Sequence, residues 1–146
     1  MSKYFDCKIK YRKIDGNGVQ KVTTESYIID ALTFSEAEAN IQKEMSAYIS
    51  EEFKVTNIKV ANYSEIIKDE RGDRWFKSKV VLLAYDETSG KEKKTNIYLL
   101  IQANNAKEAY DNTVKAMSNT MGDFKVPAVT ETNIIEVFEY ISENRL

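Results

Sequence analysis

Apolar and polar residues alternate near the beginning of the chain. Phe5, Cys7 and Ile9 are separated by polar or charged residues, which is the period-two pattern of a strand with one buried face. The segment Asp15-Gly16-Asn17-Gly18 comes next, and its glycine and asparagine residues readily adopt the positive φ angles of a tight turn. The pattern therefore predicts a β-hairpin whose second strand covers residues 19–30.

A different period follows the predicted hairpin. Ala37, Ile41 and Met45 recur every four residues, as on the buried stripe of a helix. Thr33 and Glu36 have the spacing of a capping box, which places the start of this helix. Asn105 and Glu108 predict the start of a second helix in the same way. Each helix is followed by a further strand pair, or by one strand with an extension, over 53–67 and 124–138.

The second half of the chain resembles the first. Phe53-Lys54-Val55 aligns with Phe124-Lys125-Val126 at a shift of 71 residues, and Met45-Ser46 aligns with Met117-Ser118 at a shift of 72. Predicted turns, helix starts and strands keep the same order in both halves, which indicates an internal repeat. The alignment pairs polar and aromatic residues as well: Lys8 with Lys79, Tyr27 with Tyr98, and Asn40 with Asn112.

These patterns predict an α+β protein, formed by tandem internal duplication of a ββαβ-type unit. We expect antiparallel sheets with one helix per copy and a pseudo-two-fold relation between the copies. Copy one is predicted over 1–67, an exposed charged linker over 68–74 and copy two over 75–146, packed together as one globular unit. The copies could share one sheet with both helices on one face, or form two facing lobes.

Composition excludes several kinds of chemistry. The 146 residues include no histidine and one cysteine, with 21 basic and 23 acidic side chains. Catalytic triads, Cys-His pairs, His or Cys zinc sites and disulfide frameworks are therefore excluded, and we expect no cofactor, no metal and no enzymatic activity. Cys7 belongs to the apolar alternation and is expected to be a core residue. Neither a signal peptide nor a membrane-spanning run is evident, so we expect a cytoplasmic protein without a membrane partner.

One asparagine of each predicted helix lies beside its apolar stripe. Asn40 and Asn112 occupy these positions. An amide buried without a partner costs about 1–3 kcal/mol, so each should be satisfied. The partner could be a neighbouring strand or loop, or the two amides could line a cleft between the copies.

Basic and aromatic residues form a second group. Tyr4, Lys8, Lys10 and Arg12 share one face of the first strand, and a second set lies near the linker: Arg71, Arg74, Trp75, Lys77 and Lys79. Such residues can stack on bases and neutralise phosphates. A solvated strand face that uses lysine against aggregation is the alternative interpretation, and packing at the strand start would equally explain Trp75.

Several segments resemble a known family. They are Tyr4–Tyr11, Thr33–Ala39 and Phe53–Val55. Together they are similar to a family of small uncharacterised proteins from Bacteroidetes genomes and their phages, a domain of unknown function. The resemblance implies a protein from a phage or phage-derived locus, acting in the host cell cytoplasm, and it brings no known site residues.

Three functional hypotheses follow. The first is a non-catalytic accessory protein that forms a homo-oligomer and sequesters a small nucleotide-like signalling ligand between its halves. Its predicted binding residues are Lys8, Lys79, Tyr27, Tyr98, Asn40, Asn112, Arg74 and Trp75. The second is a protein–protein interaction module that inhibits a host enzyme. The third is a single-stranded nucleic-acid binder, which the formal charge of −2 makes less favourable.

Overall fold

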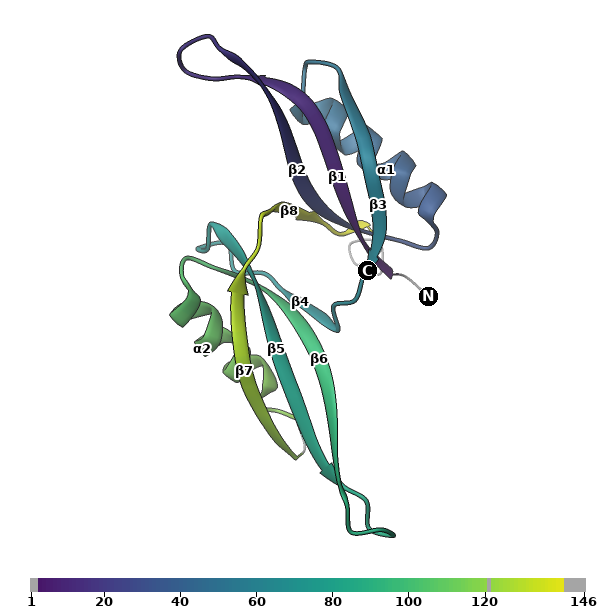
Figure 1. The fold of residues 1–146 in the computed structure, drawn as a ribbon, viewed down its shortest axis with the longest axis vertical. Coiled ribbons are helices and arrows are strands. Elements are labelled where there is room, and N and C mark those ends of the chain that lie inside the picture. Colours follow the sequence, from purple (N-terminus) through teal and green to yellow (C-terminus); the bar gives the residue numbers. More distant parts are fainter. Residues whose placement is uncertain (1–2, 121, 141–146) are drawn as a thin grey trace. The chain divides into compact units, whose positions relative to one another are not determined.

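The computed structural model describes residues 3–120 and 122–140, which form two compact units. Unit 1 contains the described residues of Met1–Ala61 and Asn133–Leu146, and unit 2 is Asn62–Thr132. The described residues form two helices and two sheets in which most strand pairs are antiparallel (Figure 1). The predicted α+β class is therefore confirmed.

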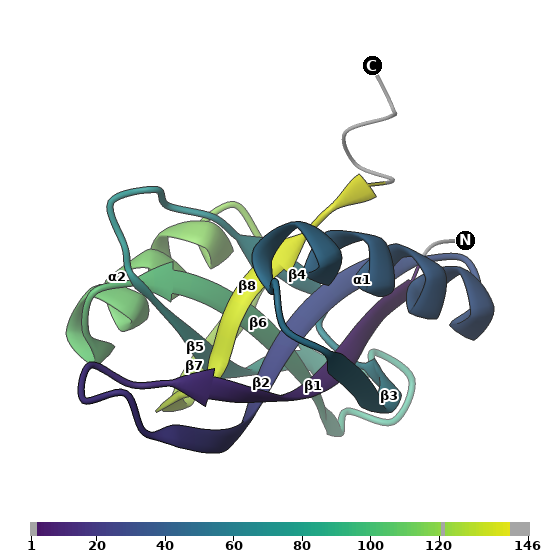
Figure 2. The ribbon, with the colours of Figure 1, turned by 90° about the horizontal axis from the view of Figure 1, so that it is seen from above.

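Unit 1 has a four-stranded sheet and one helix. Its elements are β1 (Lys3–Ile14), β2 (Gln20–Ala31), α1 (Phe34–Tyr48), β3 (Phe53–Ala61) and β8 (Ile134–Phe138). The strand order is β3-β1-β2-β8, with β8 parallel to β2 and the other pairs antiparallel. Figure 2 shows β8 running along β2.

Unit 2 also has a four-stranded sheet and one helix. Its elements are β4 (Glu65–Ile67), β5 (Arg74–Tyr85), β6 (Glu92–Ala103), α2 (Ala106–Met117) and β7 (Asp123–Glu131). The strand order is β4-β6-β5-β7, with β4 parallel to β6. A single merged sheet, which the sequence left open, is therefore excluded.

The compact units are not divided where the two halves of the sequence meet. The strand-like segment 53–67 contains both β3 and β4, but β3 pairs in unit 1 and β4 pairs with β6 in unit 2. Likewise β7 belongs to unit 2 and β8 returns to unit 1. Unit 2 is thus inserted into unit 1 between β3 and β8. The predicted halves, whose residues 1–2 and 141–146 lie outside the described residues, are halves of the sequence and not packing units.

Local sequence signals were read correctly at both helix starts and at the first turn. Thr33 Oγ1 accepts a hydrogen bond from Glu36 N at 3.1 Å, and Asn105 Oδ1 accepts one from Glu108 N at 2.8 Å. In the β1–β2 turn, Asp15 Oδ1 accepts from the backbone N–H groups of residues 17 and 19, and Gly18 has a φ of 78°. These contacts connect residues that are close in sequence, which is why the pattern predicts them.

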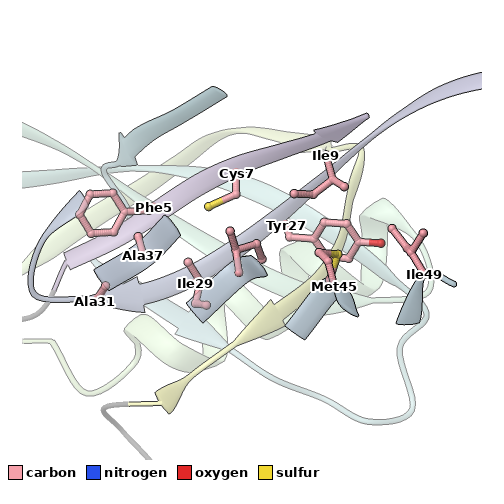
Figure 3. Close-up of a cluster of buried hydrophobic side chains, with 10 residues drawn as sticks. Phe5, Cys7, Ile9, Tyr27, Ile29, Ala31, Ala37, Met45 and Ile49 are labelled. Atoms are coloured by element: carbon pink, nitrogen blue, oxygen red, sulfur yellow. The ribbon is translucent and has the colours of Figure 1, made fainter. Parts of the chain in front are cut away.

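The core of unit 1 lies between α1 and one face of its sheet (Figure 3). Odd-numbered residues of β1 and β2, such as Phe5 and Ile29, meet Ala37 and Met45 of α1. Cys7 is part of this core, and burial raises the pKa of its thiol to about 12. The prediction that Cys7 is a core residue is confirmed.

The core of unit 2 is built in the same manner. Phe76 and Val80 of β5 and Leu99 and Ile101 of β6 pack with Ala109 of α2. Strand side chains alternate between the two faces of a sheet, and one face of each sheet packs against its helix. Lys8 of β1 and the odd-numbered residues of β5 therefore lie on the opposite face. No helix in the described part of the chain is long and apolar enough to cross a membrane.

Candidate functional site

The two predicted lysines occupy comparable places. Lys8 lies on the face of its sheet away from α1, and Lys79 lies on the face of its sheet away from α2. Both are half-buried. Lys79 is directly opposite Tyr98 in the β5–β6 pairing, and the ammonium of the neighbouring Lys77 lies 4.5 Å from the centre of the Tyr98 ring. The structure therefore brings Lys77, Lys79 and Tyr98 together on one sheet face, and Lys77 makes a cation–π contact with Tyr98.

Tyr27 and Tyr98 do not occupy the same position in their units. Tyr27 pairs with Cys7 and faces the unit 1 core, whereas Leu99 is the residue of β6 that faces the unit 2 core, so Tyr98 faces away from it. The loop between β5 and β6 covers 86–91, one residue more than the loop 15–19 between β1 and β2. A shift of one residue moves a strand side chain to the other face.

Tyr27 is a core residue in the folded unit. It is 6% exposed, its ring stacks on Phe138 with centroids 5.9 Å apart, and its hydroxyl donates to Glu25 Oε1 at 3.2 Å. Burial raises the pKa of Tyr27, and the nearby Glu25 carboxylate raises it further. Little of Tyr27 is accessible to a ligand, so its place in a binding site is not supported by its surroundings.

The two asparagines are half-buried on their helices, as their positions beside the apolar stripe predict. Neither side chain makes a hydrogen bond to another described residue, so the expected strand or loop partner is absent within 3–120 and 122–140. Asn112 lines a cavity in unit 2, whereas Asn40 lines none of the cavities described below. The two amides are therefore not equivalent in the structure.

Arg74 and Trp75, at the start of β5, also differ from each other. The Arg74 guanidinium is exposed and bonds to Glu131 Oε1 at 3.2 Å. The Trp75 side chain is 2% exposed, and its backbone oxygen accepts two hydrogen bonds from Thr132. An indole buried in this way is typical of packing, the second of the two roles considered for Trp75.

A cavity in unit 1 lies at the end of the β1–β3 pairing, and we call it the β1-edge cavity. Phe53 is the first residue of β3 and lies opposite Tyr11, so β1 has no neighbouring strand on that side beyond Tyr11 within the described residues. The cavity has a volume of about 860 Å³, within the usual range for small-molecule sites. Its lining residues are Lys10, Tyr11, Arg12, Ile14, Gln20, Val22, Gln42, Glu51, Glu52, Phe53 and Lys54.

The lining of the β1-edge cavity combines aromatic rings with cations. Tyr11 and Phe53 contribute the rings, and Lys10, Arg12 and Lys54 contribute the positive charges. None of these three cations forms an ion pair with another described residue. Glu51 and Glu52 also line the cavity, so the cations exceed the carboxylates by one. Cations in excess beside aromatic rings suit an anionic ligand with a planar ring.

A carboxylate–tyrosine network supports one wall of this cavity. The Tyr27 hydroxyl donates to Glu25 Oε1 at 3.2 Å. Burial raises the pKa of Tyr11 to about 12, and the nearby Glu25 contributes to the rise. Tyr11 therefore keeps its proton at neutral pH and can donate a hydrogen bond.

Sequence reasoning missed most of this cavity. Lys10 and Arg12 were recognised as part of a basic strand face, but Tyr11 and Phe53 were read only as strand residues. The available signal was the run Glu51-Glu52-Phe53-Lys54, which places charges around an aromatic residue at a strand start. Only the β1–β3 register brings this run beside Tyr11.

A second cavity, which we call the α2 cavity, lies in unit 2 and has a volume of about 700 Å³. It lies along α2 and the segment that follows β4. Its lining residues are Glu65, Ile67, Lys68, Asp69, Glu70, Arg71, Asn112, Lys115, Ala116 and Asn119. It contains one predicted site residue, Asn112.

The segment predicted as an exposed charged linker, 68–74, forms a loop that specific contacts hold in place. The Gln102 side chain accepts a hydrogen bond from Asp69 N and donates one to Gly72 O, both at 3.0 Å. Gly72 is buried, and its N–H donates to Asp69 O at 2.8 Å. Asp73 N donates to Asn104 Oδ1 at 3.2 Å. Most charged residues of this loop are exposed, but Asp69 is half-buried, and the backbone of the loop is held against the end of β6.

Asp6, next to Lys8 on the same strand, has a carboxylate oxygen that is buried without a hydrogen-bond partner in the described part of the chain. Burial raises the pKa of Asp6, and Lys59 and Lys8 partly oppose the rise. Because the raised pKa favours the protonated form in the folded state, Asp6 stabilises the fold at low pH. This stability is lost as the pH rises through the folded-state pKa.

We therefore expect Asp6→Asn to increase the free energy of unfolding at pH 7, because the buried charge is removed. The gain should be smaller at pH 4, because the raised pKa of Asp6 favours its protonated form in the native protein. Urea unfolding at both pH values measures the change, with Glu87→Gln in the exposed β5–β6 turn as a neutral control. A loss of stability at pH 7 would show that attraction to Lys59 and Lys8 outweighs the effect of burial.

Comparison with known proteins identifies one family. The sequence matches the family described as Domain of unknown function (DUF4494) over residues 3–140, nearly the whole chain. No curated protein and no solved structure matches it.

Proposed function

The chain belongs to the DUF4494 family, and we propose that it is a non-catalytic protein that binds and sequesters a small nucleotide-like ligand. The observation that supports this function is the β1-edge cavity, where two aromatic rings lie among three cations that form no ion pair with another described residue. The proposal keeps the ligand class expected from the sequence and assigns it to a cavity within unit 1.

Each part of a nucleotide has suitable chemistry in this cavity. The base can stack on Tyr11 or Phe53. The phosphate can be bound by Arg12, whose planar guanidinium donates two parallel hydrogen bonds, with further charge from Lys54. Carboxylates from residues 51 and 52 can accept hydrogen bonds from ribose hydroxyls or from exocyclic amino groups.

The same residues favour binding over catalysis. Tyr11 is a titratable group of the cavity whose pKa is clearly shifted, and the shift is upward to about 12. A phenol in this state does not act as a general base near neutral pH, because it stays protonated. The nearby Glu25 contributes to this upward shift, after burial.

The setting that we propose follows from the resemblance to phage-type accessory proteins. In host cytoplasm, a protein of this kind would lower the free concentration of a signalling nucleotide by mass action. We also propose that the two halves derive from a duplicated ββαβ-type unit. In support, both sheets have the same strand order, β3-β1-β2-β8 and β7-β5-β6-β4. In each sheet the third, first and second strands of one half are adjacent in that order, and the fourth position is taken by the last strand of the other half.

Thermal unfolding with a panel of mononucleotides and cyclic dinucleotides tests the function. Ligand at 100 times its dissociation constant should stabilise the protein by about 2.7 kcal/mol, which raises the midpoint by several degrees. Calorimetry with the responding nucleotide should then show about tenfold weaker binding by Arg12→Ala and by Lys54→Ala, because each removes a charge-assisted contact. Lys13→Ala, an exposed β1 variant outside the cavity, is the matched control.

Two results would overturn the proposal. No response across the panel would reject a nucleotide ligand and favour the protein-interaction hypothesis, which a pull-down from host lysate addresses. Loss of binding in the double variant Lys79→Ala/Asn112→Ala, together with normal binding by Arg12→Ala, would reject the β1-edge cavity. That second pattern would instead place the nucleotide at the residues expected from the sequence.

A further inference from the structure

The α2 cavity differs chemically from the β1-edge cavity, and we infer that it binds a small zwitterion, namely a free α-amino acid. This site is in unit 2 and takes a different ligand, so it is independent of the nucleotide function proposed above.

Charge balance is the first step of the argument. The α2 cavity is lined by equal numbers of carboxylates and cations, namely Glu65, Asp69, Glu70, Lys68, Arg71 and Lys115. An anion alone would lie near the exposed carboxylates of Glu65 and Glu70, and a cation alone would lie near Lys115. A ligand with both charges, and no net charge, matches this lining best.

Arg71 is prepared for a carboxylate. Its Nε and Nη2 atoms lie 3.1 and 3.2 Å from the two carboxylate oxygens of Asp69, which fixes the plane of the guanidinium. These bonds lower the pKa of Asp69 and keep it ionised. The Arg71 side chain is 89% exposed, so its remaining N–H groups are accessible to a ligand. The backbone that carries Arg71 is held by Gln102, which limits the cost of ordering the loop on binding.

α2 and the turn after it supply the facing groups. Asn112 and Lys115 are three residues apart and share one side of α2, and Asn119 lies in the turn that follows. The amide side chains of Asn112 and Asn119 make no hydrogen bond to another described residue, and Lys115 makes no ion pair with one. Ile67 and Ala116 add an apolar portion to the lining. The donors suit a carboxylate, Glu65 suits an ammonium group, and the apolar portion suits an aliphatic side chain.

The test is a titration of the full chain with L-leucine, monitored by two-dimensional amide NMR. We expect leucine at millimolar concentration to shift the signals of residues 68–71 and the side-chain amide of Asn112. N-acetyl-leucine lacks the ammonium and leucinamide lacks the carboxylate, so we expect each to bind at least about tenfold more weakly than leucine. Equal binding of N-acetyl-leucine would identify an anion site, and the absence of shifts with all three compounds would identify no site. Either result overturns the inference.

Two variants assign the charges. Glu65→Gln should weaken leucine binding about tenfold and leave the weaker binding of N-acetyl-leucine unchanged, because only the ammonium contact is lost. Lys115→Met should weaken both compounds. Lys107→Ala, an exposed α2 variant outside the cavity, is expected to bind leucine normally. Equal effects of Glu65→Gln on leucine and on N-acetyl-leucine would contradict the assignment.

Discussion

Replacement of Gly72 with alanine is expected to lower the free energy of unfolding by about 3 kcal/mol. An added Cβ would lie 2.6 Å from the backbone nitrogen of Ala103 and 2.7 Å from its Cα. Both atoms belong to the backbone at the end of β6, so no side-chain rotation relieves the clash. The loop must move away from β6, and the two hydrogen bonds of Gln102 are then lost or lengthened.

Thermal unfolding measures this effect. For a chain of this size we expect a midpoint lower by about 6–12 °C. Fluorescence of Trp75, the only tryptophan, reports on unit 2 in particular. Gly16→Ala is the matched control, because no atom lies within 4 Å of the Cβ that it would add. An unchanged midpoint for Gly72→Ala would show that the loop can shift without cost, and the argument for a pre-ordered Arg71 would fail with it.

The second large effect is expected at Thr113, which is fully buried on α2. Thr113 Oγ1 donates a hydrogen bond to Ala109 O at 2.7 Å. Ser78 Oγ lies 2.7 Å from Thr113 Oγ1. Because the Thr113 hydroxyl has a single proton, Ser78 is the donor in this second bond. Thr113→Val keeps the shape of the side chain but removes the acceptor. The buried hydroxyl of Ser78 is then left without a partner, and we expect a loss of about 2 kcal/mol.

A double-mutant cycle separates this cost from ordinary packing. Ser78→Ala in the Thr113→Val background removes the stranded hydroxyl, so the double variant should be more stable than Thr113→Val alone. Urea unfolding of the four proteins provides the coupling energy. Additive losses in the double variant would show that the two hydroxyls do not depend on each other, and that the bond contributes little between β5 and α2.

The helix starts and the first hairpin could be predicted because their determinants are local. Thr33 bonds to Glu36, and Asp15 bonds to the backbone of the turn that it begins. The alternation through Cys7 likewise identifies the buried face of β1, since neighbouring side chains of a strand point to opposite faces. For such features, residues a few positions apart contain the whole signal.

The linker and the tyrosine pair could not be predicted in this way. Asp69 and Gly72 are held by Gln102, some 30 residues further along the chain, and no local pattern indicates that contact. Tyr98 faces away from the core because the loop before β6 is longer by one residue. An alignment of residue types does not detect such a shift, although it moves the side chain to the other face of the sheet.

The sequence by itself determined the elements of this protein, their order and their class, because the period of apolar residues and the helix caps depend on near neighbours. The tertiary structure alone decided which sheet received β4 and β8, and which side chains met in the two cavities. Those outcomes depend on strand register and on contacts between distant segments, so Phe53 joins Tyr11 only after β3 has paired with β1.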